Sequence, residues 1–192
     1  MNMGKYNYKF RIKNFFRDEW WKIYGRQFVN PFLQKVPETI VFICKGNICR
    51  SPFAEHIAKN EFKLFNSLVI FSAGLHVKNS EKSSNYAIIT AKSYGVDLSN
   101  HCSISFDASK LYVNSMIIAM EAQQIKELKA LYPYLKSSLY LLPLFDPLRH
   151  TFAFGYDFWN IPDPYGKSCI EYNECYARIN RCVKNMVHIF NK

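Results

Sequence analysis

The sequence lacks any long apolar run. No window of its 192 residues approaches the roughly 18 consecutive apolar residues that a membrane-spanning helix needs. The first 28 residues carry charged side chains every few positions and contain no apolar core typical of a secretory signal peptide. We therefore expect a cytoplasmic protein whose six cysteines stay reduced and do not form a disulfide framework.

Acidic residues are scarce, and the sequence has neither an internal repeat nor a low-complexity tract. Asp and Glu number 15 against 25 Lys and Arg, which gives a formal net charge of +10. This excess favours anionic partners, whether phosphorylated proteins, nucleic acids or acidic membrane surfaces, and does not choose among them. With 49% hydrophobic residues, the chain has the composition of a globular protein with one good core.

Residues 1–38 differ in composition from residues 39–192. They hold ten aromatic residues, and eight Lys or Arg against three Asp or Glu. Five apolar side chains at helical spacing predict one face of an amphipathic helix: Phe16, Trp20, Ile23, Tyr24 and Phe28. This N-terminal extension is expected to pack on the domain, to bind an acidic membrane surface or to engage a partner protein. No motif supports nucleic acid binding.

The remainder of the chain alternates β-rich runs with helical stretches. Strands are expected at 39–44, 67–73, 115–120 and 137–142, and helices at 52–65, 83–95, 121–132 and 167–190. This alternation predicts an α/β fold of the flavodoxin-like or Rossmann-like kind, with a four-stranded parallel sheet covered by helices on both faces. In such sheets the ligand binds at the carboxyl ends of the strands, where the strand order reverses.

The loop after the first expected strand reads Cys-Lys-Gly-Asn-Ile-Cys-Arg-Ser, with five residues between Cys44 and Arg50. A loop of this length can turn its backbone N–H groups inward, and the following helix adds the positive end of its dipole. Gly46 and Asn47 tolerate the tight conformations that such a loop requires, and the planar fork of Arg50 can hold two phosphoryl oxygens. These surroundings and a hydrogen bond from Ser51 favour a thiolate. Cys44 is therefore predicted to be a nucleophile that attacks phosphorus.

Five segments resemble the low-molecular-weight protein tyrosine phosphatase family, and most of all its bacterial branch. They are VFICKGNICRSPFAE at 41–55, SAGL at 72–75, NHCSIS at 100–105, MIIAMEAQQI at 116–125 and IPDPYGKS at 161–168. The resemblance spans roughly 39–190 and implies hydrolysis of phosphotyrosine proteins through a phosphocysteine, without a cofactor or metal ion. It also implies a role opposing a bacterial tyrosine kinase, in exopolysaccharide or capsule control.

The resemblance identifies Asp163 as the general acid. A carboxylic acid there would protonate the leaving phenolate oxygen, and the carboxylate would later activate water. The competing Asp146-Pro147 pair lacks the Tyr-Gly that follows in the family, so we expect Asp146 to begin a turn.

The resemblance assigns supporting roles to other residues. The family has a hydrogen-bond network that braces the phosphate loop, and four residues fall at its positions: Asn47, Ser51, Ser72 and His101. For Ser72 and His101, ordinary hydrogen bonding within loops is an alternative explanation. Residues expected to line the pocket mouth are Lys45, Ile48 and Tyr165. Lys45 would favour substrates with acidic neighbours.

Cys49 and the remaining cysteines are interpreted separately. Cys49 is expected either to capture an oxidised Cys44 as a reversible disulfide or simply to pack in the loop. Cys169, Cys175 and Cys182 match no zinc-site spacing, so we expect all three to lie in the core of the last helix.

Two further features are interpreted less specifically. Glu121 is expected to start a helix. The aromatic stretch 143–160 is longer than a simple connection, so it is either a lid or docking surface or a satellite packing cluster.

Three alternative functions remain. Arsenate reductases share this fold but need further redox cysteines after the third strand, where this chain has none. Protein-arginine phosphatases tend to have Thr at the position of Ile48. A non-catalytic phosphoprotein-binding module would be expected to lose Cys44, Arg50 or Asp163, and all three are present.

Overall fold

The computed structural model describes residues 37–112, 114–149 and 155–191. The amphipathic helix expected in the N-terminal extension therefore lies outside the described residues. The strands are β1 (Thr39–Cys44), β2 (Val69–Gly74), β3 (Ser115–Ala119) and β4 (Leu139–Leu141). The helices are α2 (Arg50–Glu61), α3 (Asn85–Lys92), α4 (Ala122–Leu131), α5 (Tyr156–Trp159) and α6 (Cys169–Phe190), with 3₁₀ helices η2 (Ala108–Lys110), η3 (Pro133–Ser138) and η4 (Leu142–Phe145).

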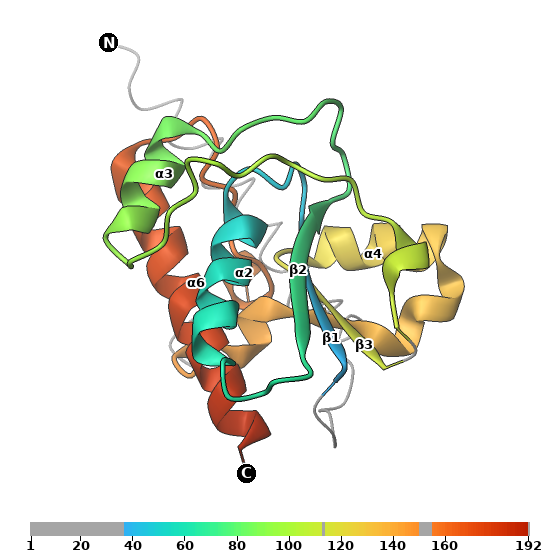
Figure 1. Cartoon of the computed structure of the whole chain (residues 1–192). Coiled ribbons are helices and arrows are strands. Elements are labelled where there is room, and N and C mark those ends of the chain that lie inside the picture. The colour runs from blue at the N-terminus through green and yellow to red at the C-terminus, as the bar shows by residue number, and fades with distance from the viewer. Residues whose placement is uncertain (1–36, 113, 150–154, 192) are drawn as a thin grey trace.

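The four strands form one parallel sheet in the order β2-β1-β3-β4, which confirms the predicted fold class. Helices α2, α3 and α6 cover one face of the sheet, and α4 covers the other (Figure 1). Because β1 lies between β2 and β3, the strand order reverses beside β1. The carboxyl ends of β1 and β3 therefore form the edge where a ligand site is expected.

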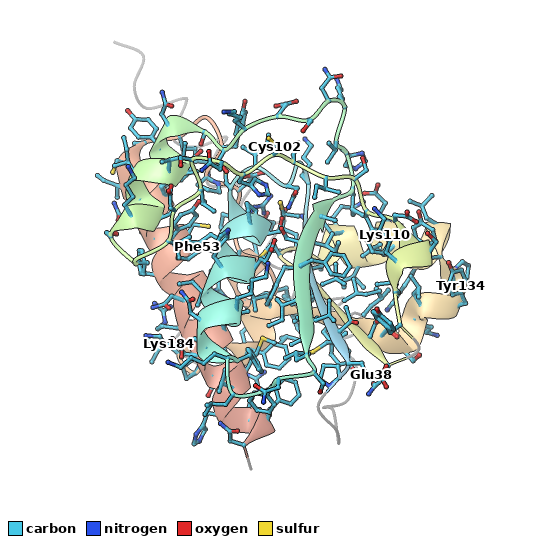
Figure 2. All side chains as sticks on the ribbon, in the orientation of Figure 1. Glu38, Phe53, Cys102, Lys110, Tyr134 and Lys184 are labelled. Carbon is cyan, nitrogen blue, oxygen red and sulfur yellow. The ribbon has the colours of Figure 1, made fainter. Side chains whose placement is uncertain are left out.

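Side chains of β1 alternate between two separate apolar cores. Ile40 and Phe42 contribute to the core beneath α2 and α6, and Val41 and Ile43 to the core beneath α4. All four are completely buried, as expected for a central strand covered on both faces. The ring of Phe53, labelled on α2 in Figure 2, stacks on Tyr176 of α6 with ring centroids 3.9 Å apart, which joins the two helices.

Several predicted boundaries were wrong, each for a local reason. The helix expected to reach residue 65 ends at Glu61, because the buried Phe62 caps it with its N–H on the Ala58 carbonyl and a turn follows. The helix expected at 83–95 occupies only Asn85–Lys92, since Ser84 caps its start and accepts a hydrogen bond from the Ala87 N–H. The fourth strand has three residues because η3 occupies the chain up to residue 138.

The cysteines of α6 only partly follow the prediction. Cys175 and Cys182 are buried in the core, whereas Cys169 is exposed on the first turn of the helix, so its predicted burial was wrong. Across the described ranges, no cluster of three or more His, Cys, Asp or Glu residues could hold a metal ion. In the same part of the chain, no helix is both long and apolar enough to cross a membrane.

Asp146 begins a turn, as predicted, with the Arg149 N–H bonded to its carbonyl at 3.1 Å. Its carboxylate is also fully buried. It pairs with Arg178 Nε at 3.0 Å and with Arg181 Nη2 at 3.1 Å, both from α6. This ion triad fixes the segment after β4 against the last helix, a role that the sequence pattern did not indicate.

Candidate active site

The loop from Cys44 to Ser51 joins β1 to α2 and turns sharply at Asn47. The φ angle of Asn47 is 54°, the left-handed region that Asn tolerates better than most residues. Its side-chain Nδ2 donates to Ser51 Oγ at 2.9 Å, and its Oδ1 accepts from the Ile104 N–H at 2.9 Å. Asn47 is fully buried, so these hydrogen bonds hold the loop in one conformation.

The sulfur of Cys44 lies inside this curled loop. The Asn47 backbone N–H donates to Sγ at 3.2 Å, and Ser51 Oγ lies 3.0 Å from it. Asn47 Nδ2 donates to Ser51 Oγ, so the serine hydroxyl proton can go either to the sulfur at 3.0 Å or to the Ala73 carbonyl oxygen at 3.4 Å, of which the sulfur is the nearer acceptor. Two donors directed at one sulfur stabilise a thiolate more than a thiol.

Ser72 and His101 both contact Asn47, where the resemblance expected them. Ser72 Oγ accepts from Asn47 Nδ2 at 2.8 Å and donates to Glu55 Oε2 at 2.6 Å. His101 Nε2 lies 2.7 Å from the Asn47 carbonyl oxygen and must donate to it, since a carbonyl only accepts. Glu55 of α2, which no sequence pattern indicated, accepts the Ser72 hydrogen bond on one carboxylate oxygen and a hydrogen bond from Lys59 on the other.

Gly74, at the end of β2, allows the loop to pass close to the strand. A Cβ at this position would lie 2.9 Å from both the Asn47 nitrogen and the Gly46 carbonyl carbon, and 2.7 Å from a methyl group of Val77. Two of these contacts are backbone atoms that cannot rotate away. The glycine in the SAGL segment is therefore required by the position of the loop.

Arg50 connects the loop to two carboxylates. Its Nη1 donates to Glu121 Oε1 at 2.5 Å and to the Ile161 carbonyl at 2.9 Å, and its Nη2 donates to Asp163 Oδ2 at 2.6 Å. Burial alone would lower the pKa of this guanidinium, but the negative charges of Cys44, Asp163 and Glu121 raise the pKa above its usual value. Arg50 is therefore a permanent, oriented cation with 1% exposure.

Glu121 caps the start of α4, as predicted, and it also pairs with Arg50. The sequence analysis did not identify this second contact. Glu121 lies two residues after the end of β3, and β3 is the strand next to β1 at the edge where the strand order reverses. In the sequence, a carboxylate at the carboxyl end of a strand beside β1 was the feature that could have indicated this contact with Arg50.

Cys49 lies in the same loop with its thiol turned toward α6. Its Sγ is 3.4 Å from Tyr172 Oη and 3.6 Å from Ser84 Oγ. Burial raises the pKa of Cys49 to about 11, although these two hydrogen bonds oppose the rise. Cys49 is therefore a neutral thiol near pH 7, and the reversible disulfide with Cys44 stays a prediction.

A cavity of about 480 Å³ opens over the loop. Residues from the loop, from the segment after β2 and from the segment before α6 line it: Cys44, Lys45, Gly46, Ile48, Cys49, Arg50, His76, Lys78, Glu81, Asp163 and Tyr165. Tyr165 is 58% exposed, as suits a residue at the rim. His76, Lys78 and Glu81 are lining residues that the sequence analysis missed.

Comparison with known proteins identifies the chain's relatives. The family model described as low molecular weight phosphotyrosine protein phosphatase matches residues 39–192. The low molecular weight protein-tyrosine-phosphatase Ptp of Acinetobacter johnsonii is 30% identical over 149 residues, which are 76% of this chain and 93% of that protein.

Two solved structures share the fold. The tyrosine phosphatase amsI of Erwinia amylovora superposes with a TM-score of 0.70 and 24% identity, over 85% of this chain and 100% of that one. The YwlE arginine phosphatase of Geobacillus stearothermophilus gives a TM-score of 0.68 and 21% identity, over 81% and 94% of the two chains. At these identities the structures support the fold alone. The family model, which matches most of the chain, and the Acinetobacter relative carry the assignment: this chain belongs to the low molecular weight phosphotyrosine protein phosphatase family.

Proposed function

We propose that the protein hydrolyses phosphotyrosine in proteins through a covalent phosphocysteine on Cys44. One observation carries the proposal: the Cys44 sulfur lies between two hydrogen-bond donors in a loop at the start of α2, and it lines the same cavity as Arg50 and Asp163. A stabilised thiolate, a fixed cation and a carboxyl group are the three parts that transfer of a phosphoryl group to sulfur requires.

In the first step, the Cys44 thiolate attacks phosphorus and the bond between phosphorus and the phenolic oxygen breaks. The carboxyl group of Asp163 gives its proton to the departing oxygen, so tyrosine leaves as a neutral phenol. Arg50 and the backbone N–H groups of the loop hold the other phosphoryl oxygens as negative charge develops on them. The product is a thiophosphate ester on Cys44.

In the second step, water attacks the phosphorus of this ester. The Asp163 carboxylate accepts a proton from the water, the phosphorus–sulfur bond breaks, and Cys44 returns as a thiolate. Inorganic phosphate is released, and Asp163 is again protonated for the next cycle.

Before substrate binds, Asp163 occupies one arm of the Arg50 fork at 2.6 Å. A phosphoryl dianion entering the cavity would compete for the same guanidinium nitrogen. Exchange of this carboxylate for phosphoryl oxygens would free Asp163 to take up a proton from solvent and to face the leaving oxygen, while Glu121 stays bound to Nη1 at 2.5 Å.

The cavity lining supports phosphotyrosine over phosphoarginine. Ile48 presents an apolar side chain to the cavity, and Tyr165 presents an aromatic ring at its rim. Both groups can pack against the phenyl ring of phosphotyrosine, whereas a phosphoguanidinium would place its hydrogen-bonding groups against the apolar side chain of Ile48.

The proposed physiological substrate is a bacterial tyrosine kinase or its phosphorylated targets, with exopolysaccharide or capsule control as the setting and the cytoplasm as the site of action. The relatives that support this setting are bacterial tyrosine phosphatases, of which the Acinetobacter protein is one. The N-terminal extension, which we expected to contact a membrane surface or a partner protein, lies almost entirely outside the residues that the structure describes.

The test measures phosphate release from a phosphotyrosine peptide by the wild type, Cys44→Ser and Asp163→Asn. The wild type is expected to turn over, Cys44→Ser to be inactive, and Asp163→Asn to be slower by about 10² to 10⁴, the usual contribution of a general acid. Cys169→Ser is the matched control, since its exposed thiol lies at the start of α6, outside the cavity lining.

Phosphoarginine is tested in the same assay, and arsenate is tested separately for reduction to arsenite with a thiol as the reductant. If the wild type does not hydrolyse phosphotyrosine but acts on either of these compounds, the proposed substrate is wrong. The assignment of Cys44 as the nucleophile would then still hold. Binding of the phosphopeptide without any turnover would favour a phosphoprotein-binding module.

A further inference from the structure

The aromatic stretch before the Asp163 segment packs against the core. Phe158 and Trp159 of α5 are 8% and 3% exposed and belong to the apolar core beneath α4. The part of 143–160 that the structure describes therefore favours the packing cluster over a lid. α5 leads directly into Ile161, whose carbonyl accepts from Arg50.

Asn160 fixes α5 against the start of α4. Its Nδ2 donates to the Tyr156 carbonyl at 2.7 Å, and its Oδ1 accepts from the Ala122 N–H at 2.9 Å. Its own carbonyl accepts from Arg178 Nη1 at 2.9 Å. Three hydrogen bonds on a residue with 1% exposure hold Tyr156 beside the residue that precedes Ala122, which is Glu121.

The hydroxyl of Tyr156 donates to Glu121 Oε2 at 3.2 Å. The other carboxylate oxygen, Oε1, accepts from Arg50 Nη1 at 2.5 Å and from Gln124 Nε2 at 3.3 Å. With donors on both oxygens, the carboxylate plane of Glu121 has little freedom to rotate. The direction of the Arg50 fork depends in turn on that plane, since Arg–carboxylate pairs are strongly directional.

We infer that Tyr156 is a positioning residue that acts through Glu121 to orient Arg50 toward the phosphoryl group. This inference rests on the proposed function of Arg50 as the phosphoryl-binding cation. It adds Tyr156 of α5, which lies outside the five segments that carry the resemblance, to the machinery of the site. Without the Tyr156 hydroxyl, Glu121 can turn, and Arg50 samples orientations in which it holds the phosphoryl oxygens less well.

The test is a double-mutant cycle of Tyr156→Phe and Glu121→Ala, read as kcat/KM on a phosphotyrosine peptide. Tyr156→Phe alone is expected to lower kcat/KM by about 3- to 10-fold, which is within the range for the net contribution of one ordinary hydrogen bond. In the Glu121→Ala background the same change is expected to cost less than about 2-fold, because its partner is already absent. Tyr134→Phe is the matched control, since that ring is 71% exposed and lies on η3 at the edge of the molecule (Figure 2).

A second readout does not depend on turnover. The dissociation constant of inorganic phosphate, measured from NMR chemical shifts of the full chain, is expected to rise in Tyr156→Phe by a factor similar to the loss of kcat/KM. An equal loss of kcat/KM in both backgrounds, or an unchanged affinity for phosphate, would overturn the inference. Turnover by the wild type tests the proposed function separately, so the two proposals can fail independently.

Discussion

At the scale of single residues, Asn47 determines the shape of the phosphate loop. Its backbone takes the left-handed conformation that lets the N–H reach the Cys44 sulfur, and its side chain contacts Ser51, Ser72 and the backbone of Ile104. Asn47 therefore stabilises the loop in two ways that can be separated by mutation: through its backbone conformation and through its side-chain hydrogen bonds.

Replacing Asn47 by Gly and by Ala separates these contributions. Both variants lose the buried side-chain hydrogen bonds, and only Ala also suffers steric strain at a φ of 54°. We expect Asn47→Ala to lower the free energy of unfolding by about 2–4 kcal/mol and Asn47→Gly by about 1 kcal/mol less than that. Urea unfolding measures both, and equal losses would argue against the conformational contribution.

Lys45 and Lys78 give the cavity rim a positive charge. Among the described residues neither lysine forms an ion pair, whereas Asp163 is paired with Arg50 and His76 Nε2 lies 2.9 Å from a carboxylate oxygen of Glu127. Glu81 is the remaining carboxylate of the lining and offsets one of the two lysines. A substrate with acidic residues beside its phosphotyrosine would therefore meet a net attraction.

We predict that Lys45→Gln lowers kcat/KM about 2- to 5-fold for a phosphopeptide flanked by Glu, as expected for an exposed charge pair. For the same peptide flanked by Gln, the change should be much smaller. Lys110→Gln serves as the control, since Lys110 is exposed on η2 and does not line the cavity. Equal effects of Lys45→Gln on the two peptides would exclude charge recognition by this lysine.

At the scale of elements, the end of β2 and the phosphate loop fit together only with a glycine at position 74. An added methyl group would contact two backbone atoms at 2.9 Å. Gly95 offers a useful contrast, because its φ of +73° disfavours alanine while no atom lies within 4 Å of the added Cβ.

Gly74→Ala should therefore displace the loop, with a loss of about 1–3 kcal/mol in stability and most of the phosphatase activity. Gly95→Ala should cost about 1–2 kcal/mol from backbone strain and leave kcat/KM unchanged. Thermal unfolding and phosphate release on both variants provide the comparison. Full activity in Gly74→Ala would mean that the loop tolerates the contact.

Most elements were predictable because hydrophobic periodicity and end signals are local properties of the sequence. The run before Cys44 and the Pro52-started helix defined the strand, the loop and the helix of the site without tertiary information. Ends were predicted less well. Phe62, for example, continues the apolar pattern of α2 in sequence but leaves the helix to pack beside Phe65 and Phe190.

Contacts between distant elements were not predictable from residue patterns. Glu121 read as a helix cap, and Asp146 as a turn residue, yet each also pairs with an arginine more than 30 residues away. A carboxylate at a turn or cap looks the same in sequence whether it faces solvent or a buried guanidinium. Resemblance to a family was needed to choose Asp163 over Asp146 as the candidate acid.

At the scale of the whole molecule, the core contains several acidic groups that burial keeps protonated. Burial raises the pKa of Cys49 from 9.0 to about 11. Burial also raises the pKa values of four other groups, each to a value above that of Cys49. These other groups are Cys175, Cys182, Tyr172 and Tyr176. In the unfolded chain all five groups would ionise at lower pH than in the folded protein.

Folding stability should therefore be greatest below about pH 9 and fall as the pH rises toward 11, since the unfolded state then loses protons that the folded state retains. Cys49 alone accounts for about 2–3 kcal/mol by pH 11. Urea unfolding at several pH values measures the slope. Cys182→Ala should flatten it and Cys169→Ala should not, so identical slopes in both variants would contradict this account.

The role of Cys44 as the nucleophile is tested most directly by the mass of the protein during turnover. Acid quench of the full chain mixed with a phosphotyrosine peptide, followed by peptide mapping, should find one added phosphoryl group on Cys44, and none in Cys44→Ala. The group is expected to accumulate when Asp163→Asn slows hydrolysis of the thiophosphate ester. A phosphoryl group on any other residue, or phosphate release without a covalent species in either protein, would contradict the assignment of Cys44 as the nucleophile.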